Sequence, residues 1–343
     1  MHTVTTIGLD IAKSVFQVHG IDAQGKVVIR RQLRRRYVLA FFQKLPPCLV
    51  GIEACASSHH WSRELQALGH TVRLMRAAYV KPYVERQKND ATDAEAICEA
   101  VTRANMRFVK TKTAERQSCL MLHRTRHLFI RQQTAVINAI RAHLAEFGIV
   151  APVGRNGVEE LLEVVADPSD KRVPEVARVC LAALGAQLRL LKLRILEFAR
   201  MINAWHRSSE TSRRLDEIPG IGPALATALV ASVADPKAFR SARDFSAWIG
   251  LVPRQRSSGG REKLGSISKQ GRSLSARPVH GWRAGRDPLC QIHGTKHRPW
   301  LTALLARRRT KVAAIALANK IARMAWALMA RSERYREPVA LAA

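Results

Sequence analysis

Four carboxylates near the start of the chain have the types and spacing of a metal site. Asp10 closes the apolar segment IGLD, and Glu53 closes another, VGIE. Asp90 and Asp93 are three residues apart at the start of a helical pattern, so they share one face of that helix. If the two apolar segments are neighbouring strands and the helix crosses their ends, four negative charges converge and repel one another unless cations lie between them.

Each carboxylate taken alone has a simpler explanation. Asp90 is suited to be the N-cap of its helix, and Asp10 could occupy a turn. The order of a strand aspartate, a strand glutamate and a helical Asp-x-x-Asp is much less expected by chance. We therefore predict a metal site formed by the four carboxylates. Two Mg²⁺ ions about 3.5–4 Å apart would satisfy them, and such a pair is suited to phosphodiester chemistry.

A second group that could do chemistry is the run Ser257-Ser258-Gly259-Gly260. Four cations flank it: Arg254, Arg256, Arg261 and Lys263. A serine hydroxyl among cations can attack a phosphodiester while the arginines stabilise the charged transition state. On composition alone, a loop that only contacts phosphate, or that is merely flexible, is the simpler interpretation. No general base is evident beside it.

The elements around the carboxylates alternate between strand and helix patterns. We expect strands at 4–9, 14–20, 26–33, 48–53 and 71–75, and helices from Val38, at 60–68 and at 90–103. Three antiparallel strands followed by a β-α-β unit and a helix favour an α/β domain of the RNase H-like kind. We place this catalytic domain at 1–110.

Two long helical patterns follow, at 113–147 and 175–206, separated by a linker at 151–170. The second has a seam with alternating spacings of four and three: Leu184, Leu188, Leu191, Ile195, Phe198, Ile202 and Trp205. This seam predicts an antiparallel coiled-coil hairpin over 111–207 that pairs with a second chain, and an ordinary core helix explains it equally well.

The remaining segment, 208–343, is expected to be mostly helical. Its turn Pro219-Gly220-Ile221-Gly222, with Pro223 at the first position of the next helix, is typical of a helix-hairpin-helix element. Backbone N–H groups at Gly220 and Gly222 would bind DNA phosphates without reading bases, although such a turn can be purely structural. We also expect nucleic-acid contacts from Lys269 and the four cations around the serines.

Composition indicates an anionic partner. The 343 residues include 57 lysines and arginines against 27 acidic residues, a net charge of +30, and 20 of these cations lie in the last 90 residues. Nucleic acid is the leading candidate, and a ribosome-like or merely soluble basic surface is the alternative. The six cysteines lack metal-site spacing, and no signal peptide or uncharged membrane-spanning stretch is evident. We expect a soluble, cytoplasmic, bacterial-type protein associated with the nucleoid and with no membrane partner.

Seven segments together resemble one known family over nearly the whole chain. They are GLDIAK, IEA followed by His60-Trp61, KNDATDA, PGIGP, GLVPRQ-x-SSGG, ISKQG and ALANKIARMAW. These segments, in this order, resemble those of the DEDD-type insertion-sequence transposases, which are relatives of the Piv DNA invertases.

The resemblance implies roles by position. Asp10, Glu53, Asp90 and Asp93 would be the Mg²⁺-binding tetrad of a RuvC-like N-terminal domain. Ser258 would be the nucleophile of a C-terminal transposase domain and would form a transient serine–DNA phosphodiester. The adjacent Ser257 leaves that assignment open by one residue. The family further implies double-stranded DNA partners (element ends and target), a structured guide RNA, and a homo-oligomer, a dimer or a tetramer, with active sites shared between subunits.

One stretch departs from the family pattern. Where an amphipathic helix is expected, residues 272–291 contain two prolines and two glycines, which disfavour a helix. We hypothesise two compensating frameshifts or local degeneration, and a family-like peptide in another reading frame of the coding DNA would show the former. Two alternatives to an active recombinase therefore stay open: a RuvC-like metal nuclease that needs the tetrad but not Ser258, and an inactive nucleic-acid-binding remnant.

Overall fold

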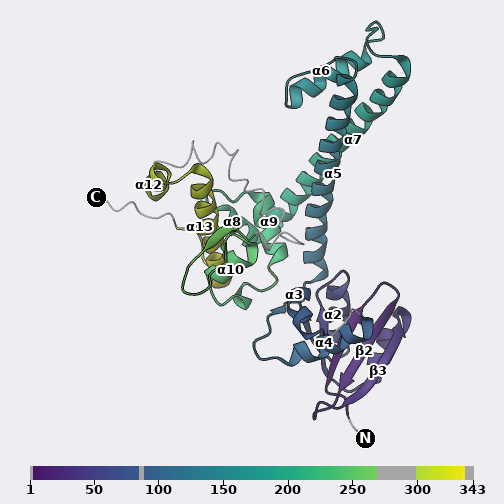
Figure 1. Ribbon diagram of the computed structural model, residues 1–343, viewed down its shortest axis with the longest axis vertical. Helices are drawn as coiled ribbons and strands as arrows, with labels where there is room; N and C mark the ends of the chain where they lie inside the picture. The colour runs from purple at the N-terminus through teal and green to yellow at the C-terminus, as the bar shows by residue number, and fades with distance from the viewer. Residues whose placement is uncertain (1–2, 85–88, 269–298, 337–343) are drawn as a thin grey trace. The chain divides into compact units, whose positions relative to one another are not determined.

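The computed structural model describes residues 3–84, 89–268 and 299–336, and Figure 1 shows its elements. The chain divides into two compact units, Met1–Gln117 and Ser118–Ala343. Lys269 and the irregular stretch 272–291 lie outside the described residues.

A six-stranded mixed sheet forms the centre of the first unit, in the order β3-β2-β1-β4-β5-β6. The strands are β1 (Thr6–Ile11), β2 (Val15–Ile21), β3 (Val27–Arg34), β4 (Leu49–Glu53), β5 (Thr71–Met75) and β6 (Phe108–Val109). β1, β4 and β5 are parallel neighbours, whereas β2, β3 and β6 are added antiparallel. The five predicted strands are confirmed to within two residues at each end. The two-residue strand β6 was not predicted, because two residues carry no periodicity.

Short helices complete the first unit. They are η1 (Arg35–Tyr37), α1 (Val38–Phe42), α2 (Ser58–Ala67), α3 (Ala77–Val80), η2 (Lys81–Tyr83) and α4 (Asp90–Thr102). The aromatic side chains Phe16, Phe42 and Trp61 are buried in one core cluster with apolar residues of the sheet. This packing joins α1 and α2 to the sheet and fixes the strands that carry the site.

Helix α4 packs against the strands where two glycines leave room. A Cβ added at Gly8 would lie 2.0 Å from the Ala94 carbonyl oxygen, and one at Gly51 would lie 2.8 Å from the Cβ of Val101. Both distances are shorter than any van der Waals contact. The absence of a side chain at these two strand positions therefore lets the backbone of α4 approach β1 and β4.

Two long helices lie side by side in the second unit (Figure 1): α5 (Ala114–Ala145) and α7 (Glu175–Ser208). They run antiparallel, since Phe129 meets Phe198 edge to face while Ile140 and Leu188 share a buried cluster nearer the connecting end. The predicted seam of α7 is thus used within the chain.

The segment 151–170 is not a plain linker as predicted. It contains α6 (Arg155–Ala166), whose Val158, Leu161 and Val165 are buried against α7. Their spacing of three and four residues was the missed signal, obscured by the glycine, proline and aspartate residues around it.

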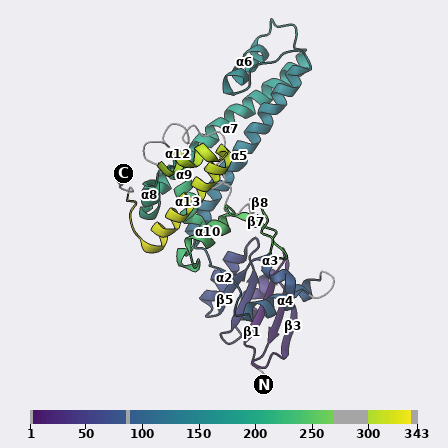
Figure 2. The ribbon, with the colours of Figure 1, turned by 60° about the vertical axis from the view of Figure 1, so that its left-hand side comes forward.

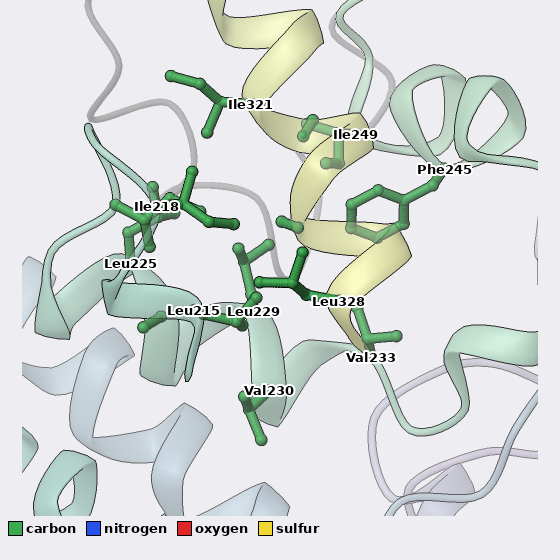
Figure 3. Packing of buried hydrophobic residues seen from close by; sticks show 14 of the residues in the cluster. Leu215, Ile218, Leu225, Leu229, Val230, Val233, Phe245, Ile249, Ile321 and Leu328 are labelled. Carbon is green, nitrogen blue, oxygen red and sulfur yellow. The ribbon is translucent and has the colours of Figure 1, made fainter. Parts of the chain in front are cut away.

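The rest of the second unit is mostly helical, as predicted. Its elements are α8 (Glu210–Asp216), α9 (Pro223–Ser232), η3 (Pro236–Ala238), α10 (Ala242–Ile249), β7 (Pro253–Gln255), β8 (Leu264–Ile267), α12 (Pro299–Arg307) and α13 (Thr310–Arg331). Figure 3 shows their shared core, in which Leu215, Leu229, Phe245 and Ile321 come together from α8, α9, α10 and α13. Helix α8 begins at Glu210, directly after Ser209, whose side chain caps it.

Of the described helices, α13 alone has the length and mean hydropathy (1.4) needed to cross a membrane. One face of α13 packs into the protein core: its Ala318, Ala322 and Ala325 are buried in the cluster that Figure 3 shows. This packing accounts for the apolar composition of α13 as that of a core helix.

Candidate functional site

The strand alternation and α4 bring the predicted carboxylates to one place. Successive side chains of a strand point to opposite faces, so Asp10 shares the face of Gly8, and Glu53 shares that of Gly51. This is the face on which α4 packs, and α4 begins with Asp90 and Asp93. One ligand oxygen each from Asp10, Asp90 and Asp93 lies within 4.8 Å of the others.

Glu53 completes the lining of the same pocket. The cavity, of about 650 Å³, is bounded by all four predicted carboxylates. Glu53 stands at the carboxyl end of β4, next to the carboxyl end of β1 that carries Asp10. The structure therefore brings the four carboxylates together, with three of them in the tightest group.

The beginning of α4 is capped by Asn89 and not by Asp90. The Asn89 side-chain oxygen accepts a hydrogen bond from the Ala91 N–H at 3.0 Å. The N-cap explanation considered for Asp90 is therefore wrong, and both aspartates are in the first helical turn. The helix dipole favours negative charge there, which offsets part of the repulsion in the cluster.

The environment of Asp10 disfavours its ionised form. Burial, followed by the charges of Asp93, Asp90 and Glu53, raises the pKa of Asp10 from 3.8 to about 6. A carboxyl group surrounded by like charges binds a cation that removes the repulsion. All the donors are carboxylate oxygens, the hard ligands that Mg²⁺ prefers. The residues present thus fit a divalent-metal site.

The pocket also contains residues that the sequence patterns did not indicate. Ala77, Val80 and Lys81 line it from α3 and η2, between β5 and α4. Lys81 brings a positive charge to the rim of an otherwise acidic cavity. Only the fold reveals it, because one lysine in the sequence of a basic protein carries no specific signal.

The serine run forms the tip of a hairpin made by β7 and β8 (Figure 2). Gly259 and Gly260 have φ values of +56° and +74°, and Ser258 and Arg261 pair across them. Two successive residues with positive φ make a tight turn for which glycine is best suited. The two glycines therefore place both serines beside the tip.

The two serine hydroxyls differ in their partners. The Ser257 Oγ accepts hydrogen bonds from the Lys263 N–H and the Gln255 amide, both at 3.1 Å. The side chain of Ser258 makes no hydrogen bond to another described residue, and Ser258 is exposed. Ser257 thus stabilises the hairpin, whereas the hydroxyl of Ser258 faces solvent.

The predicted cations lie along the same hairpin. Arg254, Arg256 and Lys263 line a second cavity of about 280 Å³ at its base, and Arg261 is at the turn. Arg254 also donates to the Ser268 carbonyl oxygen at 3.3 Å, which links the two strands. The cavity is large enough for an anion and is surrounded by positive charge.

The predicted turn before α9 is present. Gly222 is the N-cap residue of α9, and Pro223 opens the helix. Gly220 has a φ of +98° and is exposed. Of the two predicted phosphate-binding glycines, Gly222 therefore lies at the start of a ten-residue helix, and Gly220 lies two residues before it.

Comparisons with known proteins give one consistent result. Residues 7–149 match a transposase model of the DEDD, IS110 type, and residues 212–277 match the model described as "Transposase IS116/IS110/IS902 family". The second match ends inside the irregular stretch 272–291.

Full-length relatives agree with the models. A "Probable family 20 transposase" of Pseudomonas aeruginosa is 48% identical over 97% of this chain and 99% of its own length. The "Transposase for insertion sequence element IS1111A" of Coxiella burnetii is 39% identical over 98% of this chain and 92% of its own. The corresponding protein of element IS1328 in Yersinia enterocolitica is 37% identical over 95% and 97%.

Proposed function

This chain belongs to the DEDD-type insertion-sequence transposases of the IS110 family, enzymes that cleave and rejoin DNA, and we propose that it does so by Mg²⁺-dependent chemistry through a serine–DNA intermediate. The observation that carries the proposal is the convergence of Asp10, Glu53, Asp90 and Asp93 on one pocket. The second part of the proposal, the serine–DNA intermediate, is supported by Ser258, which is exposed at the tip of a cationic hairpin.

In this account Asp10, Asp90 and Asp93 would hold the metal, and Glu53 would be a further ligand from the same pocket. Bound Mg²⁺ supplies Lewis-acid activation of a phosphodiester and of its nucleophile. The protein holds the carboxylates in a fixed arrangement through the contacts of α4 with β1 and β4. Lys81 binds a phosphate oxygen at the rim of the pocket.

Ser258 acts on the strand that is exchanged. Its oxygen forms a bond to phosphorus as the bond from phosphorus to a sugar oxygen breaks, and the serine proton ends on the released sugar hydroxyl. One phosphodiester replaces another, so the strand can be rejoined without ATP. Arg254, Arg256 and Lys263 stabilise the charge that develops on the phosphate oxygens.

Double-stranded DNA at the element ends and at the target is the substrate. We assign the turn at Gly220 and Gly222 to a helix-hairpin-helix element that contacts phosphates through backbone N–H groups. A structured guide RNA selects the sites by base pairing, in line with a net charge of +30. Because the proposed substrate is DNA, we expect the protein to act in the cytoplasm, at the nucleoid.

The active assembly is a homo-oligomer, a dimer or a tetramer, formed through the long helices of the arm at 111–207. The outer side of α7 supports this assignment. It has an exposed apolar stripe, separate from the seam that packs inside the chain, with alternating spacings of three and four residues: Val176, Val179, Ala183, Ala186, Leu190 and Leu193. Such a stripe is suited to helix pairing between copies.

A cleavage assay tests the metal half of the proposal. Purified protein, its element-end RNA, labelled donor and target duplexes and Mg²⁺ are combined, and products are separated on a denaturing gel. Asp10→Asn is expected to abolish cleavage, whereas Glu99→Gln, which removes a carboxylate of α4 outside the pocket, retains it. Cleavage that persists without divalent cations or in Asp10→Asn would contradict the proposal.

Two alternatives give different results in the same assay. A RuvC-like nuclease, favoured by a carboxylate pocket formed wholly within the first unit, would cleave equally well as Ser258→Ala. An inactive remnant, suggested by the stretch 272–291, would bind DNA and produce no cleavage in any variant.

A further inference from the structure

The sheet face that carries Asp10 continues past the acidic pocket onto the edge strand β3. Asp10 is paired with Gln17 of β2, and Gln17 is paired with Gln32 of β3. Directly paired residues lie on the same face of a sheet, and so do residues two positions apart on one strand. Gln32 and its neighbours Arg30 and Arg34 therefore share the face of Asp10.

Helix α4 covers this face over β1, β2 and β4, while β3 extends beyond it at the free edge (Figure 1). One ion pair marks the border. The Arg30 guanidinium lies 3.4 Å from the Glu95 carboxylate on α4, and the Arg30 side chain is still 66% exposed. Gln32 and Arg34 are exposed as well. The outer strand thus presents an open polar surface, defined by Arg30, Gln32 and Arg34, which we call the β3 face.

The β3 face reaches the end of the sheet where the carboxylates lie. Ala12 lines the acidic pocket, and its N–H donates to the Val15 carbonyl oxygen at 3.2 Å. Val15 is in turn paired with Arg34. Two strand spacings separate the backbones of Ala12 and Arg34, or about 10 Å. The guanidinium of Arg34 can therefore contact a molecule that also enters the pocket.

The charge of this surface complements a polyanion. The acidic pocket repels phosphate groups, so a DNA strand that enters it needs cations next to the pocket to hold its backbone. Arg34 has no ion pair with any described residue. Arg30 and Arg34 are four residues apart along the strand, about 13 Å, which corresponds to about four nucleotides of rise along one DNA strand.

We propose that the β3 face binds the sugar–phosphate backbone of the DNA duplex whose cleaved phosphodiester lies in the acidic pocket. This inference rests on the proposed function, because it takes the pocket as the place of cleavage. Arg30 and Arg34 contact phosphates, Gln32 donates its amide N–H groups to the backbone between them, and no base is read. The simpler alternative to this proposal is that the two arginines on the edge strand only prevent its pairing with a strand of another chain.

The test measures duplex binding by the full-length protein without Mg²⁺, so that it does not depend on cleavage. The probe is a fluorescein-labelled DNA duplex of mixed sequence, titrated at several KCl concentrations between about 50 and 200 mM. Arg30→Gln/Arg34→Gln is compared with Lys26→Gln/Lys44→Gln. This control removes the same charge from exposed positions of the same unit at the opposite end of the sheet, where β3 and β4 begin.

Loss of two phosphate contacts is expected to reduce the slope of log K against log[KCl] by about 2 and to weaken binding about tenfold at the lowest salt, with the control unchanged. An unchanged slope in the arginine variant, or an equal reduction in both variants, would overturn the proposal.

Photocrosslinking gives an independent result that does not depend on the folding of the double variant. Benzoylphenylalanine at position 34 is expected to crosslink to the duplex, and the same group at position 44 is not. A crosslink at 44 and none at 34 would overturn the proposal. If the crosslink forms at 34 while Mg²⁺-dependent cleavage is absent, the proposed chemistry fails and the binding surface stands.

Discussion

Asp10 is the residue whose surroundings say most about the site. Its pKa is raised from 3.8 to about 6, first by burial and then by Asp93, Asp90 and Glu53. An acid whose pKa is higher in the folded protein than in the unfolded chain destabilises the fold once it is ionised. This cost is absent below about pH 4, develops between pH 4 and 6, and persists above pH 6 until a cation binds.

Asp10→Asn is therefore expected to stabilise the metal-free protein at neutral pH. Because water screens this half-buried group, we expect a gain of about 1 kcal/mol in the free energy of unfolding at pH 7, and none near pH 4. Urea unfolding in EDTA at the two pH values measures it. Mg²⁺ should raise the stability of the wild type at pH 7 and leave the variant unchanged. An equal gain at both pH values would show that repulsion is not the cause.

At the scale of elements, the approach of α4 to the sheet decides whether the carboxylates meet. Gly8→Ala places a Cβ 2.0 Å from the Ala94 carbonyl oxygen and 2.5 Å from the Cys98 nitrogen, so α4 must move. We expect a loss of about 3 kcal/mol in the free energy of unfolding. Gly265→Ala, where the nearest atom would be 3.6 Å away, is the control and should change stability by less than about 0.5 kcal/mol. Equal stability of the two variants in urea unfolding would contradict this account.

A buried histidine joins α5 to α9 in the second unit. The Thr227 hydroxyl donates to the Pro223 carbonyl oxygen at 2.8 Å, so it accepts from the His123 Nε2–H, 2.9 Å away. Burial, and then the charge of Arg126, lowers the pKa of His123 from 6.5 to about 4. The unfolded chain consequently binds a proton between pH 6.5 and 4 that the folded protein does not.

The wild type should therefore lose about 2 kcal/mol of stability relative to His123→Gln as the pH falls from 6.5 to 4. Glutamine keeps a donor for Thr227 and cannot be protonated in this range. Urea unfolding of both proteins at pH 7 and pH 4.5 gives the difference, and parallel changes in the two would contradict the role assigned to His123.

At the scale of the whole molecule, the proposed homo-oligomer would form through the outer stripe of α7. Leu190 and Leu193 are 55% and 66% exposed. Leu190→Glu/Leu193→Glu is expected to yield monomers in light scattering, because carboxylates would be buried between the helices. Gln187→Glu/Asn203→Glu adds the same charge at other exposed positions of α7 and should leave the assembly intact. A monomeric wild type, or dissociation of both variants, would contradict a helix-mediated oligomer.

The sequence allowed the sheet and the carboxylate pocket to be predicted because both depend on local patterns. Apolar segments ending in Asp10 and Glu53 indicated strands, and the spacing of Asp90 and Asp93 indicated one helical face. The N-cap role of Asn89 is also local and was missed because the neighbouring aspartate is an equally good cap. Lys81 and Arg34 could not be identified, since their positions near the pocket depend on strand order and register.

The hairpin that carries the serines illustrates the same limit. Gly259-Gly260 is a local turn signal, yet the composition around it also fits a flexible loop. Which hydroxyl is available depended on the cross-strand hydrogen bond from the Lys263 N–H to Ser257. A contact between residues of two strands cannot be deduced from either strand alone.

The most direct test of the account is the detection of a covalent protein–DNA adduct. Purified protein with its element-end RNA, donor and target duplexes and Mg²⁺ is denatured, and labelled DNA that migrates with the protein is measured on a gel. We predict an adduct in the wild type and in Ser257→Ala, and none in Ser258→Ala or Asp10→Asn. Cleavage without an adduct that persists in Ser258→Ala would contradict the serine mechanism and identify a metal nuclease.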